Sequence, residues 1–192
     1  MVTEELVEKI ILLTEQKLNA WKCHNGYAPV EASNKLDNVM FDWIISLTAS
    51  LRMWVKKGLF MTDGELILAC ANLGSLVESM MKLVLSVHIL DYYRDPLKND
   101  KGKVVQPEKI KFKNLKTFCF DKVWPETETN HYGVSYKAMK EWVGEVEEKR
   151  NAIHAFNKKE LGSASDFIND IGIYWEFVNL VFDTLPADPY YE

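Results

Sequence analysis

Apolar residues recur at intervals of three and four positions along most of the chain, which is the spacing that places them on one face of an α-helix. This pattern predicts helices at about residues 4–21, 34–57, 63–93, 107–123, 136–157 and 166–185. The connections between most of these segments are short, as is usual between antiparallel neighbours. The pattern therefore predicts an all-α protein, an up-and-down helical bundle of five to six helices.

Residues that favour helix ends mark several of these boundaries. Thr62 and Glu65 form a capping-box pattern before the most apolar stretch. Gly58 is expected to end the preceding helix. Ser135 and Ser165 are expected to cap the last two helices. The predicted helices are therefore supported by local signals as well as by periodicity.

Composition agrees with a helical protein. Nine glycines and six prolines among 192 residues interrupt the chain rarely, which favours long helices over many short strands. The hydrophobic fraction of 47% and the charged fraction of 27% are those of an ordinary globular domain, and the length suits a single one. A loop is expected at 94–107, where a short hairpin through Val104 and Val105 is left open as an alternative.

Charge and cysteine usage narrow the classes of function. The net charge of −5 excludes a globally basic nucleic-acid binder, although it leaves room for a local basic patch. The three cysteines are far apart and form no CxxC pair, so we expect free buried thiols in a reducing cytoplasm, no zinc site and no other cofactor. The acidic N-terminal sequence lacks the basic start of a signal peptide.

The stretch 66–90 has the length and hydropathy of a membrane span. It carries Asn72, Glu78 and Lys82 near its middle, and a charge at the centre of a bilayer costs about 3 kcal/mol on insertion scales. We therefore expect a buried central helix and no membrane partner.

A lysine-rich segment at 98–122 carries a local charge of +5, because eight lysines stand against three acidic residues. Phe112, Phe118 and Phe120 are interleaved with the lysines. One interpretation is a patch that follows a nucleic-acid backbone. The other is a solvated helix face with the phenylalanines in the core, and the spacing of the phenylalanines favours it.

One charged residue of the helix predicted at 136–157 lies where an apolar residue belongs. At 100° per residue, Arg150 falls inside the apolar stripe of this helix. Burying an unpaired guanidinium is costly, and arginine does not lose its proton, so the fold must supply a partner, a water-filled pocket or a ligand. Glu147 and Glu78 are candidate partners, and Lys82 would compete for Glu78. Two interpretations are open: an ion pair that fixes the register of the bundle, or a polar cleft where Arg150 binds phosphate and His154 transfers protons.

The segment Lys149-Arg150-Asn151-Ala152-Ile153-His154-Ala155-Phe156 resembles the signature helix of the HEPN superfamily (higher eukaryotes and prokaryotes nucleotide-binding domains). In that motif an arginine, commonly followed by Asn, Asp or His, precedes a histidine. Here three residues separate Arg150 from His154, fewer than is usual in the family, and counting from Lys149 restores the usual spacing. Residues 71–82 also resemble an earlier core helix of such domains.

The resemblance covers about residues 62–185 and implies a four-helix core there. Residues 1–60 would then be an N-terminal helical pair or elaboration, and residues 186–192 a tail.

The resemblance implies two kinds of function. Many members with an intact motif are metal-independent endoribonucleases, often toxins or defence proteins, whose sites form across a homodimer. Arg150 would then stabilise the charged phosphate, His154 would transfer protons, and Asn151 would orient either group on RNA or a nucleotide. The polar residues expected around such a site are Glu78, Lys82, Glu147 and Lys149. Other members are inactive modules that act through homodimerisation or by binding another protein, which for a toxin would be its antitoxin.

Overall fold

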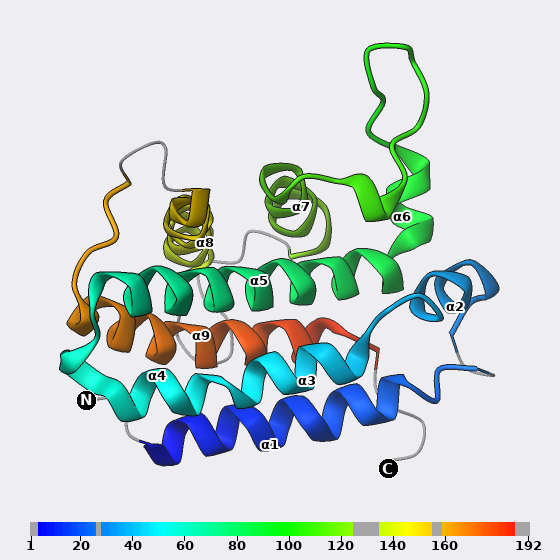
Figure 1. Ribbon diagram of the computed structural model, residues 1–192. Coiled ribbons are helices and arrows are strands. Elements are labelled where there is room, and N and C mark those ends of the chain that lie inside the picture. The colour runs from blue at the N-terminus through cyan, green and yellow to red at the C-terminus, as the bar shows by residue number, and fades with distance from the viewer. Residues whose placement is uncertain (1–3, 26–27, 125–134, 155–158, 187–192) are drawn as a thin grey trace.

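The most apolar helix of the chain lies at the centre of the fold (Figure 1). The computed structural model describes residues 4–25, 28–124, 135–154 and 159–186. The central helix is α5 (Asp63–Val87). It contacts α2 (Val30–Leu36), α3 (Phe41–Ala49), α4 (Leu51–Lys57), α7 (Phe112–Phe118), α8 (Tyr136–Arg150) and α9 (Ala164–Thr184). The predicted all-α class is confirmed: over the described ranges, β-structure is limited to one isolated antiparallel bridge between Lys98 and Val104.

Helix α5 is also the one helix of the described ranges whose length and hydropathy would suit a membrane span. In its most apolar window 56% of the residues are buried inside the protein. In Figure 1, α7 and α8 lie above α5, while α9, α3, α4 and α1 lie below it. This placement is that of the buried central helix expected from the sequence.

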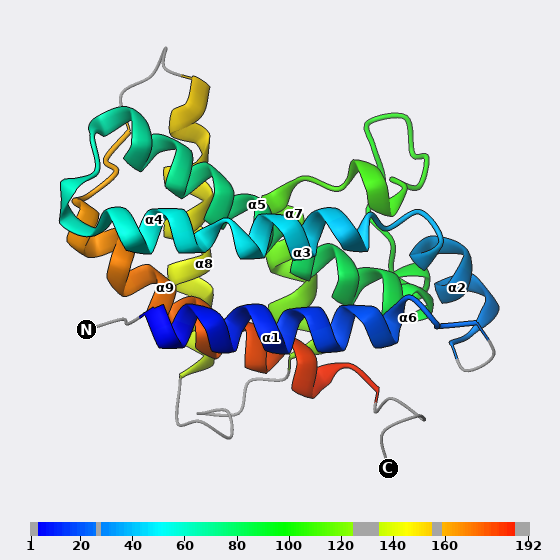
Figure 2. The ribbon, with the colours of Figure 1, turned by 60° about the horizontal axis from the view of Figure 1, so that its bottom comes forward.

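The N-terminal helices share the hydrophobic core with the rest of the described chain. Helix α1 (Glu4–Trp21) has the bounds predicted from the sequence, and it packs against α3, α4 and α9. Figures 1 and 2 show α1 running along the α3–α4 pair. On the surface, the guanidinium of Arg52 on α4 holds both carboxylate oxygens of Glu8 on α1 at 2.5 Å.

The single helix predicted at 34–57 is wrong, because the chain forms α2, α3 and α4 there. The backbone leaves the helical conformation between α2 and α3, where Met40 has φ −81° and ψ 67°. The side chain of Asn38 donates to the carbonyl oxygen of Asn34 at 3.0 Å, which offers the backbone an alternative to a continued helix. The end of α4 at Gly58, with φ 56°, is as predicted.

The long helix predicted at 63–93 also divides. Its capping box at Thr62 and Glu65 is confirmed, but α5 ends at Val87, and the short helix α6 (Ile89–Arg94) follows a break at His88. At this break the ring of His88 contacts the carboxylate of Asp91 at 3.3 Å. The chain then turns, so that α6 packs against α2.

The helix predicted at 107–123 is present in three parts. A 3-10 turn at Pro107–Lys109 precedes α7, and a π-helical turn at Cys119–Val123 follows it. The wide turn closes through a hydrogen bond from the Trp124 amide to the Cys119 carbonyl at 2.8 Å. It places the fully buried Trp124 so that its indole donates to the hydroxyl of Thr184 on α9 at 2.9 Å.

The last two helices differ from prediction at one end each. Ser135 caps α8 as predicted, but α8 ends at Arg150 and a 3-10 turn, Asn151–His154, replaces its expected continuation. Residues 155–157 of the predicted helix lie outside the described ranges. Helix α9 is capped by Ser163 and not by Ser165, because Asp166 at the third helical position completes a capping box with Ser163.

Candidate functional site

Arg150, the residue singled out by the sequence, lies where α8 crosses close to α5. Its aliphatic stem rests on Gly74 of α5. A Cβ atom built on Gly74 would be 2.5 Å from the Cβ and 2.8 Å from the Cγ of Arg150. The missing side chain at Gly74 therefore allows the end of α8 to lie directly on the backbone of α5.

The guanidinium of Arg150 belongs to a three-residue ion cluster. It contacts Oε2 of Glu78 at 2.7 Å, and Nζ of Lys82 contacts Oε1 of the same carboxylate at 2.9 Å. Glu78 is mostly buried, with 16% of its side chain exposed, while Arg150 keeps 34%. Gly74, Glu78 and Lys82 are spaced four residues apart and so share one face of α5. The cluster carries a net charge of +1, and its arginine is bound to a carboxylate of the protein itself.

The sequence offered two partners for Arg150, and the structure selects Glu78. Glu147 lies half-buried on α8. Lys82 takes the position expected of it, on the carboxylate that Arg150 binds.

Asn151 and His154 do not continue the helical face of Arg150. Asn151 ends α8, and its amide donates to the carbonyls of Glu147 and Lys149. Residues four apart are separated by about 40° around an α-helix but by about 120° in a 3-10 helix. The continuous α-helix on which the expected shared face of Arg150 and His154 depends is therefore absent at these residues. His154 is exposed to solvent, and residues 155–156 of the motif lie outside the described ranges.

Lys149 is turned toward a different partner. Its Nζ contacts Oδ2 of Asp170 on α9 at 2.7 Å, with both side chains largely buried. The indole of Trp142 donates to the other oxygen of Asp170 at 2.9 Å. Lys149 thus fastens α8 to α9, whereas Arg150 fastens α8 to α5. Sequence reasoning missed Asp170, although an acidic residue between Phe167 and Ile171 on an apolar helix was a signal.

A groove lies between α3 and α5 and is called the α3–α5 groove below. It has a volume of about 310 Å³. Its apolar lining comes mainly from Val39, Met40, Trp43, Ile44, Leu47 and Leu83. Trp43 is 70% exposed although its position in the sequence pattern is apolar. Lys82 belongs both to the ion cluster and to the groove lining, so the two features are continuous along α5.

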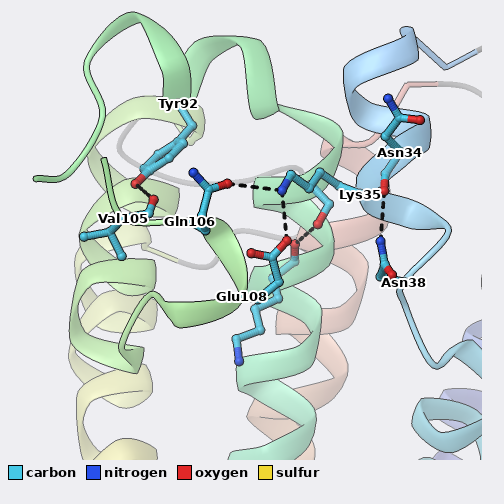
Figure 3. A network of polar contacts seen from close by, with 9 residues as sticks. Asn34, Lys35, Asn38, Tyr92, Val105, Gln106 and Glu108 are labelled. Atoms are coloured by element: carbon cyan, nitrogen blue, oxygen red, sulfur yellow. Dashed lines mark hydrogen bonds and ion pairs between the residues drawn. The ribbon is translucent and has the colours of Figure 1, made fainter. Parts of the chain in front are cut away.

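Two residues that line the groove, Lys35 and Glu108, belong to a network of polar contacts (Figure 3). Nζ of Lys35 on α2 contacts Oε1 of Glu108 at 2.9 Å and donates to the side-chain oxygen of Gln106 at 3.5 Å. The hydrogen bond between Lys35 and Glu108 raises the pKa of Lys35 and lowers the pKa of Glu108. Nearby, the hydroxyl of Tyr92 donates to the carbonyl of Val105 at 2.6 Å. The loop before Pro107 is thereby tied to α2 and α6.

The phenylalanines of the lysine-rich segment are buried, as the packing interpretation expects. Phe118 packs edge-on against Tyr92, and Phe120 packs edge-on against Trp124. The lysines lie on the surface except Lys116, which is half-buried, and Lys122 pairs with Asp95 at 2.9 Å. This segment therefore contributes core residues to the fold, and most of its charge stays in solvent.

No family model, no curated protein and no solved structure matches the chain. Over the described ranges, no group of three or more His, Cys, Asp or Glu side chains is placed to hold a metal ion. The ion cluster and the α3–α5 groove are therefore the candidate functional features of the described residues.

Proposed function

We propose that this protein is a non-catalytic helical module that acts by binding a protein surface, the second of the two functions that the HEPN-like motif suggests. The observation that carries the proposal is the ion pair between Arg150 and Glu78. A phosphate would have to displace a charge-assisted bond of 2.7 Å and would leave a mostly buried carboxylate with Lys82 alone. The free thiols of Cys70 and Cys119 in the core suit a reducing cytoplasm, where we place the protein.

The position of His154 supports the same proposal. A general acid or base works when it lies within hydrogen-bond reach of the reacting group and is held in orientation. His154 is exposed on a single 3-10 turn that follows the end of α8. This arrangement resembles a helix end better than a prepared catalytic pair.

The second candidate is binding of RNA or a nucleotide phosphate, with metal-independent cleavage as its consequence and an antitoxin as a partner. Three features favour it. The ion cluster has a net charge of +1, and about a third of the Arg150 side chain faces solvent. The exposed Trp43 in the adjoining groove also offers a surface on which a base could stack.

The deciding experiment is an RNA-cleavage assay without divalent metal, on transfer, ribosomal and messenger RNA. We expect the wild-type protein to leave all three intact. Cleavage by the wild type that is lost in His154→Ala would overturn the module proposal and establish the ribonuclease.

The structural role of Arg150 is tested by a double-mutant cycle with Arg150→Gln and Glu78→Gln, read as free energies of unfolding. We expect each single variant to lose about 1–2 kcal/mol, since the pair is intermediate between exposed and buried. The double variant should lose less than the sum of the two. Additive losses would mean that the pair does not couple α8 to α5.

A further inference from the structure

We propose that the α3–α5 groove is the docking site of a second copy of this chain, with Trp43 of each copy entering the groove of the other. This inference rests on the proposed module function and names its partner. It depends on the shape of α3, on the charges at the groove rim and on the surface available.

Helix α3 presents a row of anchors to solvent. Met40 just before it, Trp43 and Leu47 are spaced by three and four residues, which puts them in one stripe. Their exposures are 58%, 70% and 38%. Apolar anchors at this spacing are what a helix uses to enter a groove, and tryptophan is among the residues that most often dominate a binding interface.

The stripe and the groove are adjacent, because the same three residues also line one wall of the groove. A two-fold interface requires that the same patch of both copies meet, so that each supplies what the other accepts. A helix that carries the anchor on its outer side and bounds the receiving groove satisfies this condition. The groove volume of about 310 Å³ gives room for an indole ring.

The charges on the rim suit a second copy better than an anionic ligand. Lys35 and Lys82 are positive and Glu108 is negative, and each lysine is already paired with a carboxylate of its own chain. A rim of mixed sign lets a lysine of one copy face the carboxylate of the other. An anion would meet an apolar lining and two lysines that already contact carboxylates of their own chain.

The available surface predicts a small, reversible interface. An aromatic side chain contributes about 150–250 Å², so two copies of Trp43 at 70% exposure supply roughly 200–350 Å². A stable interface buries about 1,200–2,000 Å² in total. The tryptophans thus supply about a fifth of it, and the remaining area must come from Met40, Leu47 and the groove walls. We therefore expect a weak dimer that dissociates on dilution.

The test is sedimentation velocity on the full chain from low micromolar to near-millimolar concentration, with a matched pair of variants. Trp43→Lys removes the anchor. Leu12→Lys places the same charge on α1 at a residue with nearly equal exposure, 68% against 70%, that does not line the groove. We expect the wild type and Leu12→Lys to dimerise alike and Trp43→Lys to bind itself about 30-fold more weakly or worse. Both substituted positions are exposed, so circular dichroism should show unchanged folds.

A second variant tests the groove itself. Ser79→Trp fills the receiving groove while leaving the anchor in place, so it should also be monomeric. Mixed with Trp43→Lys, which keeps an open groove, it should form more dimer than either variant does alone, because one anchor and one groove can then meet.

A wild type that stays monomeric at every concentration overturns this inference, and so does a dimer that Leu12→Lys weakens as much as Trp43→Lys does. Neither result bears on RNA cleavage, so the proposed function can stand without the dimer. Conversely, cleavage that depends on His154, in a protein that dimerises through Trp43, overturns the proposed function and supports the groove assignment.

Discussion

Gly74→Ala is the substitution that most directly tests the contact between α5 and α8. The added methyl group would be 2.5 Å from the Cβ and 2.8 Å from the Cγ of Arg150, well inside van der Waals contact. The Cβ of Arg150 is fixed to its backbone and cannot swing aside as a side-chain tip can. The two helices must therefore move apart, and the ion pair with Glu78 must adjust with them.

The expected magnitude follows from two opposing effects. Overpacking a tight contact costs about 1–3 kcal/mol, and replacing glycine by alanine inside a helix gains about 1 kcal/mol. At the upper part of the first range, the net loss is about 1–2 kcal/mol. For a protein of this length, that loss corresponds to a melting temperature lower by roughly 2–8 °C. Urea denaturation followed by circular dichroism measures the free energy directly.

The same substitution at Gly64 provides the control. Gly64 is in the first turn of α5, and a Cβ there would have no neighbour within 4 Å. Gly64→Ala should therefore leave stability unchanged or raise it slightly. In an Arg150→Gly background, Gly74→Ala should cost less, because the nearest colliding atom is gone. If Gly74→Ala proves as stable as the wild type, the close approach of α8 to α5 is refuted.

Three further expectations concern other parts of the protein. Asp170→Ala breaks a buried ion pair and should lower the free energy of unfolding by about 3–5 kcal/mol. Chemical denaturation should show that this loss is larger than the loss caused by Arg150→Gln. Hydrogen bonds from Lys57 and from the Thr62 amide lower the pKa of Glu65 from 4.5 to about 2. The stability due to this carboxylate is thus full above about pH 4.5 and lost as the pH falls toward 2. Between pH 2 and pH 4.5 the free energy of unfolding should therefore change less in Glu65→Gln than in the wild type. An equal change in both proteins would contradict the assignment. Finally, a thiol reagent at neutral pH should label Cys23 quickly and the other two cysteines only on unfolding, because Cys23 alone of the three is exposed.

The reactivity of the buried cysteines has a physical basis. Burial raises the pKa of Cys70 to about 11 and that of Cys119 further still. Because the thiolate is the reactive form, both groups stay protonated and inert near neutral pH.

The central helix and its cap could be predicted because their signals are local. The capping box at Thr62 and Glu65 depends on residues three apart, and the apolar content of α5 is visible in any window. The need of Arg150 for a partner was also visible, because its angle on the helix puts it in an apolar stripe. Glu78 was an available partner because it is an acidic residue on the most apolar helix.

Other features depend on how helices are placed in space. The apolar pattern of the sequence would suit a buried face at Met40, Trp43 and Leu47. Their exposure becomes visible only in the structure, where no described helix covers them. Lys149 and Arg150 are neighbours in sequence and only about 100° apart around α8. Which of them reaches Glu78 and which reaches Asp170 is decided by the positions of α5 and α9 on either side.

The contact between α1 and α9 has a consequence for how the protein is made. Between Trp21 and Ala164 the ribosome adds more than 140 residues, which takes roughly 7–30 s at about 5–20 residues per second. During that interval α3 and α4 are the partners available to the apolar side of α1. The core closes only when α9 emerges, so truncation before residue 164 should leave α1 partly uncovered and prone to capture by chaperones.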